Sequence, residues 1–273
     1  MFNKSLAALA SLAVLTMAVL IAPVAHAQTL DEIMAKHYEA QGGLELLKKM
    51  NSVRLSGKMQ IGPGMEAPLT IEKKRPGMMR MDFTFQGMTG TTAYDGTTGW
   101  QSMPFMGKKD PEPMSPDDAR EVEQQADFDG PLVDWKAKGH TLELIGKESV
   151  EGAETFKLKL TRKSGSAEFY FIDSETWLIL KQTAKRTVRG TEIEGESLFS
   201  DYKDVGGMLF PHAMTNGIVG SEQKQSMSFD KIEVNPVLDD SRFHMPAVAA
   251  AADSAAAPAK PAAAKPAAKP VKK

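Results

Sequence analysis

Residues Lys73–Phe83 read KKRPGMMRMDF, and this stretch decides the fold. It begins with charge, turns at a proline–glycine pair, and then alternates methionine with arginine and aspartate. A period of two is typical of a β-strand, and the apolar positions continue to Phe85. Methionine is flexible and polarisable, and it is frequent on surfaces that accept varied apolar shapes. The pattern therefore predicts a strand that presents Met79 and Met81 on one apolar face.

The same alternation recurs between residues 53 and 234, which predicts many more strands. Turn sequences such as Asp95-Gly96 and Gly206-Gly207 divide the alternating segments, as turns between hairpin strands do. Clean alternation through so many strands predicts an antiparallel sheet with one apolar face and one solvated face.

Two segments are predicted to be helical. Residues 29–50 begin with capping-box spacing between Thr29 and Glu32, and a glycine pair at 42–43 interrupts them. Residues 116–126 follow Ser115, a good N-cap, and open with proline and two aspartates. A shorter helical piece is predicted over residues 132–136. The predicted fold class is α+β, mainly antiparallel β, with an N-terminal helix and a helical insertion. The leading helix covers the apolar face only in part, so the insertion or another molecule must cover the rest.

Both ends of the chain differ from this body. Residues 1–27 have the basic start, apolar stretch and small-residue cleavage site of a signal peptide, so we expect cleavage after Ala27 and a periplasmic location. An uncleaved membrane anchor is the alternative, which the well-formed cleavage site disfavours. Residues 28–246 suit a single domain, and residues 247–273 form an Ala/Pro/Lys-rich tail that we expect to be disordered.

Charge separates the body from the tail. The whole chain has a net charge of −2 although both of its ends are basic, so the body is acidic. One interpretation of the five lysines in the tail is that they only add solubility. The other is a weak attraction to anionic head groups or cell-wall polymers, at about 1 kcal/mol per lysine near a charged membrane.

No catalytic motif occurs in the sequence. The histidines lack the spacing of metal ligands, and HExxH, GxSxG, P-loop and GxGxxG motifs are absent. Export and an acidic body disfavour nucleic-acid binding. We therefore expect a protein that is not an enzyme and has no metal and no cofactor. The 17 methionines favour an apolar binding surface, with ordinary core filling as the competing interpretation. An unrecognised hydrolase would need converging polar groups on that surface.

Residues 73–105 resemble the LolA family of periplasmic lipoprotein carriers. In that family a lysine–arginine–proline turn precedes a strand of bulky apolar residues, and an aspartate–glycine turn then leads to an aromatic residue and a proline. The closing segment DDSRFHMP, residues 239–246, is similar to the family's final phenylalanine-x-proline element. Methionines in place of aromatic residues and the lysine–proline tail are departures. The matching residues are Lys74, Arg75, Pro76, Met79, Met81, Asp95, Gly96, Trp100 and Pro104.

The resemblance implies an unclosed β-barrel, or half-barrel, whose apolar concave face binds acyl chains beneath a helical lid. Arg75 matches the arginine that hydrogen-bonds to the lid and keeps the free protein closed, a role that suits its five donors. A solvated turn arginine is the competing interpretation. The residues implied to line the cavity are Met79, Met81, Phe83, Phe85 and Trp100.

The implied function is a soluble, monomeric periplasmic carrier that binds acyl chains of lipoproteins or lipids and moves them toward the outer membrane. Its partners would be those acyl chains, an inner-membrane donor and an outer-membrane acceptor. The related receptor LolB is lipidated, which this cysteine-free chain cannot be. The alternative function is an envelope sensor similar to RseB, which binds a protein partner without transport; RseB has a second domain, for which the body leaves little room.

Overall fold

The computed structural model describes residues 28–188 and 191–247. The expected signal peptide and almost all of the expected tail lie outside the described residues. Three α-helices are present in the described part, together with two short 3-10 helices: α1 (Leu30–Ala40), α2 (Leu44–Lys49), α3 (Pro116–Ala126), η1 (Pro104–Met106) and η2 (Asp240–Arg242).

The strands are β1 (Ser52–Gly62), β2 (Met65–Lys74), β3 (Met78–Phe85), β4 (Met88–Tyr94), β5 (Gly99–Met103), β6 (Lys108–Pro113), β7 (Thr141–Val150), β8 (Ala153–Thr161), β9 (Ala167–Asp173), β10 (Ile179–Val188), β11 (Thr191–Val205), β12 (Met208–Ile218) and β13 (Lys224–Val234).

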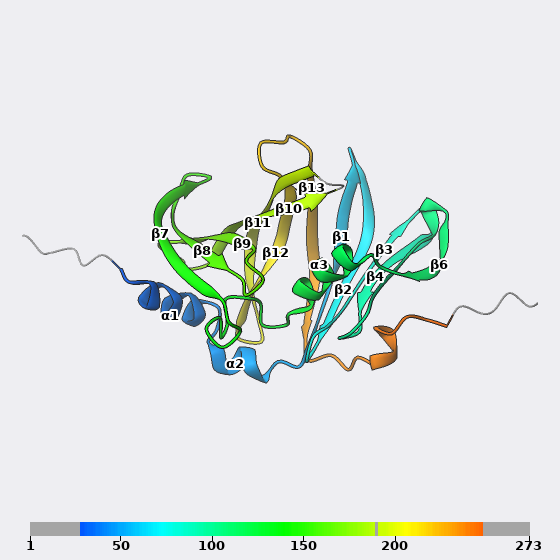
Figure 1. The fold of residues 1–273 in the computed structure, drawn as a ribbon, viewed down its shortest axis with the longest axis horizontal. Coiled ribbons are helices and arrows are strands. Elements are labelled where there is room, and N and C mark those ends of the chain that lie inside the picture. Colours follow the sequence, from blue (N-terminus) through cyan, green and yellow to red (C-terminus); the bar gives the residue numbers. More distant parts are fainter. Residues whose placement is uncertain (1–27, 189–190, 248–273) are drawn as a thin grey trace, which may run out of the picture.

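All thirteen strands form one antiparallel sheet, in the order β6-β5-β4-β3-β2-β1-β13-β12-β11-β10-β9-β8-β7. The first and last strands of the sequence, β1 and β13, are neighbours at its centre, and β6 and β7 are its two edges. The sheet curves around the helices without closing (Figure 1). The predicted fold class, an unclosed and mainly antiparallel barrel with an N-terminal helix and an inserted helix, is confirmed.

Helix α1 covers the β7–β9 end of the sheet. Thr29 and Glu32 form the predicted capping box, which fixes where the helix begins. Its buried residues Ile33 and Met34 pack in one cluster with Leu158 and other apolar side chains of β7, β8 and β9. The predicted glycine break follows, and the shorter α2 continues the chain toward β1. This half of the apolar face is therefore filled by the protein's own leading helix.

The connection from β6 to β7 crosses the hollow of the sheet, and it begins with α3 (Figure 1). Helix α3 has the predicted bounds, and the Ser115 hydroxyl accepts a hydrogen bond from the Asp118 amide as an N-cap. The prediction of a helix at residues 132–136 is wrong, because this part is a series of turns. We call residues 116–139 the lid.

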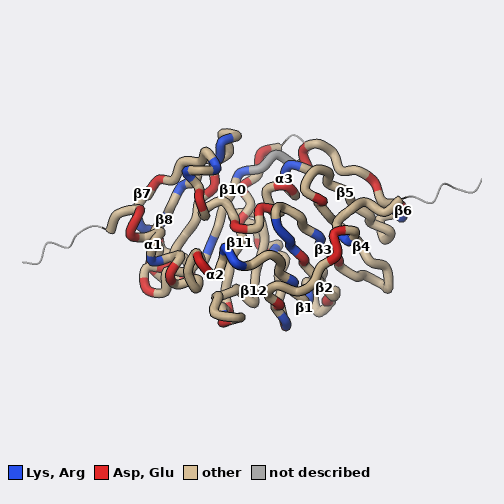
Figure 2. The backbone as a smooth tube through the Cα atoms, turned by 90° about the horizontal axis from the view of Figure 1, so that it is seen from below, with Lys and Arg blue, Asp and Glu red and all other residues tan. Residues whose placement is uncertain are grey.

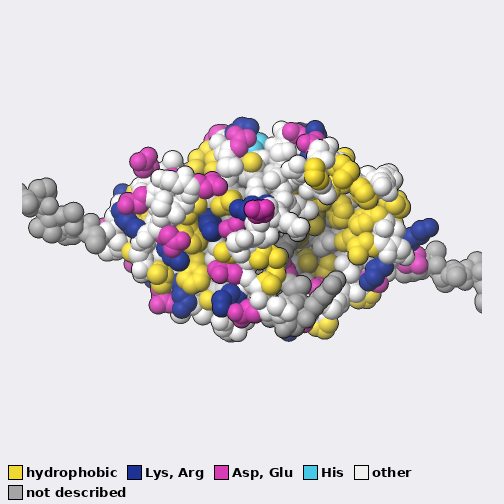
Figure 3. Space-filling view, turned by 90° about the horizontal axis from the view of Figure 1, so that it is seen from above, with side chains coloured by type: hydrophobic (Ala, Val, Ile, Leu, Met, Phe, Trp, Pro, Cys, Tyr) yellow, Lys and Arg dark blue, Asp and Glu magenta, His cyan; other side chains and the backbone are white. Residues whose placement is uncertain are grey.

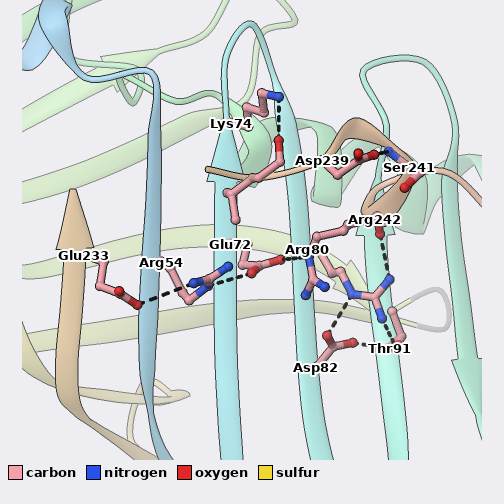
Figure 4. A network of polar contacts seen from close by, with 11 residues as sticks. Arg54, Glu72, Lys74, Arg80, Asp82, Thr91, Glu233, Asp239, Ser241 and Arg242 are labelled. Atoms are coloured by element: carbon pink, nitrogen blue, oxygen red, sulfur yellow. Dashed lines mark hydrogen bonds and ion pairs between the residues drawn. The ribbon is translucent and has the colours of Figure 1, made fainter. Parts of the chain in front are cut away.

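The alternation predicts that the other face of the sheet is solvated. The structure shows that part of this face is covered by the closing segment of the chain. Residues 236–246 lie across it at β2–β5, and Phe243 is fully buried there. The carboxylate of Glu72, 1% exposed, accepts hydrogen bonds from Arg54 at 2.7 Å and Arg242 at 2.8 Å (Figure 4). Because a buried carboxylate needs such partners, this network fixes the closing segment to β2.

No helix within the described ranges is long and apolar enough to span a membrane. In the part of the chain that the structure describes, acidic and basic residues are interspersed over the strands and helices (Figure 2). This distribution does not have the basic stripe that is typical of a nucleic-acid interface.

Candidate functional site

Strand β3 carries the apolar residues that the sequence singled out. Met79, Met81, Phe83 and Phe85 alternate along it and so share one face. Cross-strand partners lie on the same face of a sheet, and here they extend the apolar surface to β2 and β4. We call this surface the β3 face; it comprises Met79, Met81, Phe83 and Phe85 with their register partners Ile71, Leu69 and Tyr94.

Burial decreases along the β3 face. Met79 is 4% exposed, whereas Met81, Phe83 and Phe85 are half-buried. The Phe105 ring lies 5.1 Å from that of Phe83 and 6.2 Å from that of Phe85. Beyond them Met106 is 70% exposed, and hydrophobic side chains gather at this end of the molecule, at the right of Figure 3. The apolar surface therefore continues from beneath the lid to solvent.

Helix α3 covers the buried end of the β3 face. It contacts β3, β4 and β5, and its Val122 and Ala126 pack against Met79 and Tyr94. Most of its other residues are charged or amide-bearing and lie toward solvent. A buried valine contributes about 1.5–3 kcal/mol. The helix therefore shields Met79 from water through a small apolar contact.

Arg75, which precedes β3, connects the lid to the body. Its guanidinium donates to both carboxylate oxygens of Asp129, at 2.6 and 2.5 Å, and to the carbonyls of Leu47 at 3.2 Å and Met50 at 2.6 Å. The Phe128 ring stacks on it at 4.6 Å. The hydrogen bonds with Asp129 raise the pKa of Arg75 further above its ordinary value. Arg75 thus joins the end of α2, the start of β3 and the residues that follow α3.

The far end of the lid is anchored independently of Arg75. Leu132 is buried in the cluster beneath α1, and its carbonyl accepts a hydrogen bond from the Tyr38 hydroxyl at 2.7 Å. Lys138 donates to the Asp127 carboxylate at 2.6 Å and to the Gly130 carbonyl at 2.7 Å. The Lys138 contacts tie Asp127, the residue after α3, to this anchored end of the lid.

Trp100 lies on the other face of the sheet. Its register partner is Ala93, which neighbours Tyr94 on β4 and so faces away from the β3 face. Its indole donates to the Phe243 carbonyl at 2.7 Å, beneath the closing segment. Trp100 therefore anchors residues 236–246, and the implied position in the cavity lining does not fit its geometry.

A shallow groove of about 280 Å³ lies away from the β3 face, between Tyr38, Leu44 and residues 134–137. Within the described residues, no three His, Cys, Asp or Glu side chains gather as metal ligands. What the β3 face offers chemically is apolar contact beneath a small helix, whose C-terminal end is held by Arg75 through Asp129 and by Lys138 through Asp127.

Comparison with protein-family models and with curated proteins finds no match. Solved structures do match. A DUF1329 family protein from Desulfovibrio piger is 14% identical with a TM-score of 0.55, over 76% of this chain and 95% of its own. A LolA superfamily protein from Nitrosomonas europaea is 15% identical with a TM-score of 0.53, over 80% of this chain and 98% of its own.

A third structure, described as an outer membrane lipoprotein-sorting protein domain from Vibrio parahaemolyticus, is 12% identical with a TM-score of 0.52. It covers 78% of this chain and 94% of its own. The chain has the fold of LolA superfamily proteins. The resemblance noted in residues 73–105 is thus confirmed at the level of fold, and the low identity leaves function to be argued from the site.

Proposed function

We propose that this protein is a periplasmic carrier that binds acyl chains of lipoproteins or lipids on the β3 face and moves them toward the outer membrane. The observation that carries the proposal is the β3 face itself, which is apolar, methionine-rich and covered at one end by the short helix α3. The LolA-like fold is consistent with this role. Arg75 is the latch that keeps α3 in place when no acyl chain is bound.

The energetics of exchange favour an acyl chain over α3. The helix gains about 1.5–3 kcal/mol from Val122, with a smaller amount from Ala126. Each methylene of an acyl chain gains about 0.8 kcal/mol on burial, so about eight methylenes gain about 6 kcal/mol. Along β3 the face extends about 20 Å from Met79 to Phe85, at about 3.3 Å per residue. An acyl chain that replaces α3 can therefore offset the loss of both the helix contacts and the latch.

The methionines suit a ligand of this kind. An acyl chain has no fixed shape, and unbranched thioether side chains adapt to it better than branched or aromatic ones. Met79 packs against Val122 and Ala126 in the closed protein and would pack against the chain after α3 moves. Met81 and Phe83, which are already half-exposed, would contact the chain first.

Native mass spectrometry of protein purified from the periplasm tests the proposal. We expect bound lipid or lipoprotein, and we expect the emptied protein to bind a diacylated peptide but not the same peptide without acyl chains. Equal affinity for the two peptides would contradict acyl-chain binding. One protein partner in fixed stoichiometry, with no lipid, would instead support a sensor.

A further inference from the structure

The end of β2 and the residue after it carry three cations in a row, and the side chains of two of them have partners. Arg75 binds Asp129, and Lys74 donates to Asp240 at 2.5 Å and to the Leu238 carbonyl at 2.7 Å on the other face. The side-chain ammonium of Lys73 has no hydrogen-bond or ion-pair partner among the described residues, although its backbone is paired in the sheet. This difference singles out Lys73, because an ammonium removed from water without a partner costs free energy.

The register places Lys73 at the covered end of the β3 face. It pairs with Met79 on β3 and with Val53 on β1, and these two residues are 4% and 6% exposed. Ile71, two residues earlier, packs in the same cluster as Met79. Lys73 itself keeps partial exposure. Its ammonium is therefore near the boundary between an apolar surface and water, where the head group of an amphiphile would lie.

The charges around Lys73 leave its own charge uncompensated. Burial lowers the pKa of Lys73, and Asp127 opposes that shift without forming an ion pair with it. The Asp127 carboxylate is already bound by Lys138, and Asp129 is bound by Arg75. Glu123 of α3 interacts with the Tyr94 hydroxyl instead; burial raises the pKa of Tyr94, and Glu123 contributes to this shift. Asp129 balances the charge of Arg75 and Asp127 balances that of Lys138, so the Lys73 ammonium is the unbalanced charge of this group. The site thus favours an added anion.

We infer that Lys73 is the head-group site of the β3 face, where its ammonium binds the carboxylate or phosphate of an anionic acyl lipid. The inference rests on the proposed function, because the chain of that lipid lies along Met79 and Met81. A charge-assisted hydrogen bond in a poorly hydrated place is stronger than one to an ester carbonyl. The protein therefore prefers anionic acyl lipids over neutral ones with the same chain.

Competition against a neutral fluorescent probe, 1-N-phenylnaphthylamine, tests this preference with ligands matched in chain length. The first arm compares palmitate with its methyl ester, and the second compares dipalmitoyl phosphatidic acid with dipalmitoylglycerol. We expect the wild-type protein to bind at least one anion about tenfold more tightly than its neutral counterpart. The arm that shows the preference identifies the head group as carboxylate or phosphate.

Variants then assign the preference to Lys73. In Lys73→Met the preference disappears while affinity for the neutral ligand stays the same or rises, because methionine continues the apolar surface. Lys74→Met, which removes the same charge from the other face, keeps the preference, and so does Lys73→Arg. Circular dichroism checks that each variant is folded.

The pH dependence provides a second readout. The Lys73 pKa is lowered by burial, so the ammonium is charged below that pKa and the preference disappears as pH rises through it. Affinity for the methyl ester does not follow this titration. Equal wild-type affinity for acid and ester would overturn the head-group site and leave acyl-chain binding intact, whereas no binding of any ligand would overturn both proposals.

Discussion

Removal of the Arg75 side chain should release α3 from the sheet without unfolding the sheet. Arg75→Leu eliminates two hydrogen bonds to Asp129 and one each to the carbonyls of Leu47 and Met50. A hydrogen bond to a charged group contributes about 1.5–3 kcal/mol when buried. Because the Arg75 and Asp129 side chains are 26% and 20% exposed, solvent screening reduces this contribution. Only the two bonds to Asp129 reach the lid, so we expect the closed lid to lose about 2–3 kcal/mol.

A loss of this size is large enough to be measured by the hydrogen exchange of individual amides. Each 1.4 kcal/mol is a tenfold change in an equilibrium, so the population with α3 displaced should rise about 30- to 150-fold. Native-state hydrogen exchange of α3 amides reports this population directly. The amides of β8, which lie in the cluster beneath α1, should keep their protection. The affinity for a diacylated peptide should rise as well, because the closed lid competes with it.

A charge-matched control separates the latch from a general electrostatic effect. Lys58→Leu removes one positive charge from an exposed position on β1, where Lys58 pairs with Glu66. Equal exchange of α3 in the two variants would refute the latch. Loss of protection in β8 to the same extent as in α3 would show instead that Arg75 stabilises the whole fold.

Three further variants test other parts of the structure. Met79→Ala should destabilise the protein by about 2–4 kcal/mol in urea denaturation, and Met81→Ala by clearly less, because only Met79 is fully packed. Glu72→Gln should cost about 3 kcal/mol and expose residues 236–246 to proteolysis, since it breaks a buried carboxylate's contacts with two arginines. Burial alone would raise the pKa of Asp95, but hydrogen bonds from Thr97, Thr98 and His244 lower it to about 2. The folded-state pKa is thus below the ordinary 3.8, so Asp95 adds about 2 kcal/mol above that pH, which is lost as pH falls toward 2. Asp95→Asn should therefore destabilise the protein at pH 7 but hardly at pH 2, as thermal unfolding at the two pH values can show.

Local signals predicted the helices well. The cap at Ser115, with proline and aspartates after it, marked where α3 begins. The capping box at Thr29 and the glycine pair at 42–43 did the same for the leading helices. These features depend on neighbouring residues alone, so sequence reasoning can recover them. The turns of residues 132–136 lack such caps, and their conformation follows from the burial of Leu132 beneath α1.

Strand β6 was missed for a physical reason. Its sequence, KKDPEP, is charged and contains two prolines, which is unfavourable inside a sheet. As an edge strand it needs hydrogen bonds on one side only, and proline and lysine are common there. Composition reveals such a strand only when the pairing of its neighbour is already known.

The face of Trp100 could have been deduced from the sequence. The turns between β3 and β4 and between β4 and β5 contain two and four residues. Because both numbers are even, the alternation can be followed through the two hairpins. It places Trp100 and Met79 on different faces of the sheet. Asp129 as the partner of Arg75 could not be deduced in this way, since 54 residues separate them and only the tertiary fold brings them together.

The two edges of the sheet, β6 and β7, are joined by one continuous piece of chain that includes the lid. The lid is therefore part of a single connection between the two edges of the unclosed sheet. Because Leu132 and Tyr38 anchor the β7 end of this connection, a ligand that moved the two edges apart would pull on α3. In the proposed carrier, the volume of a bound molecule and the position of α3 would therefore be mechanically linked.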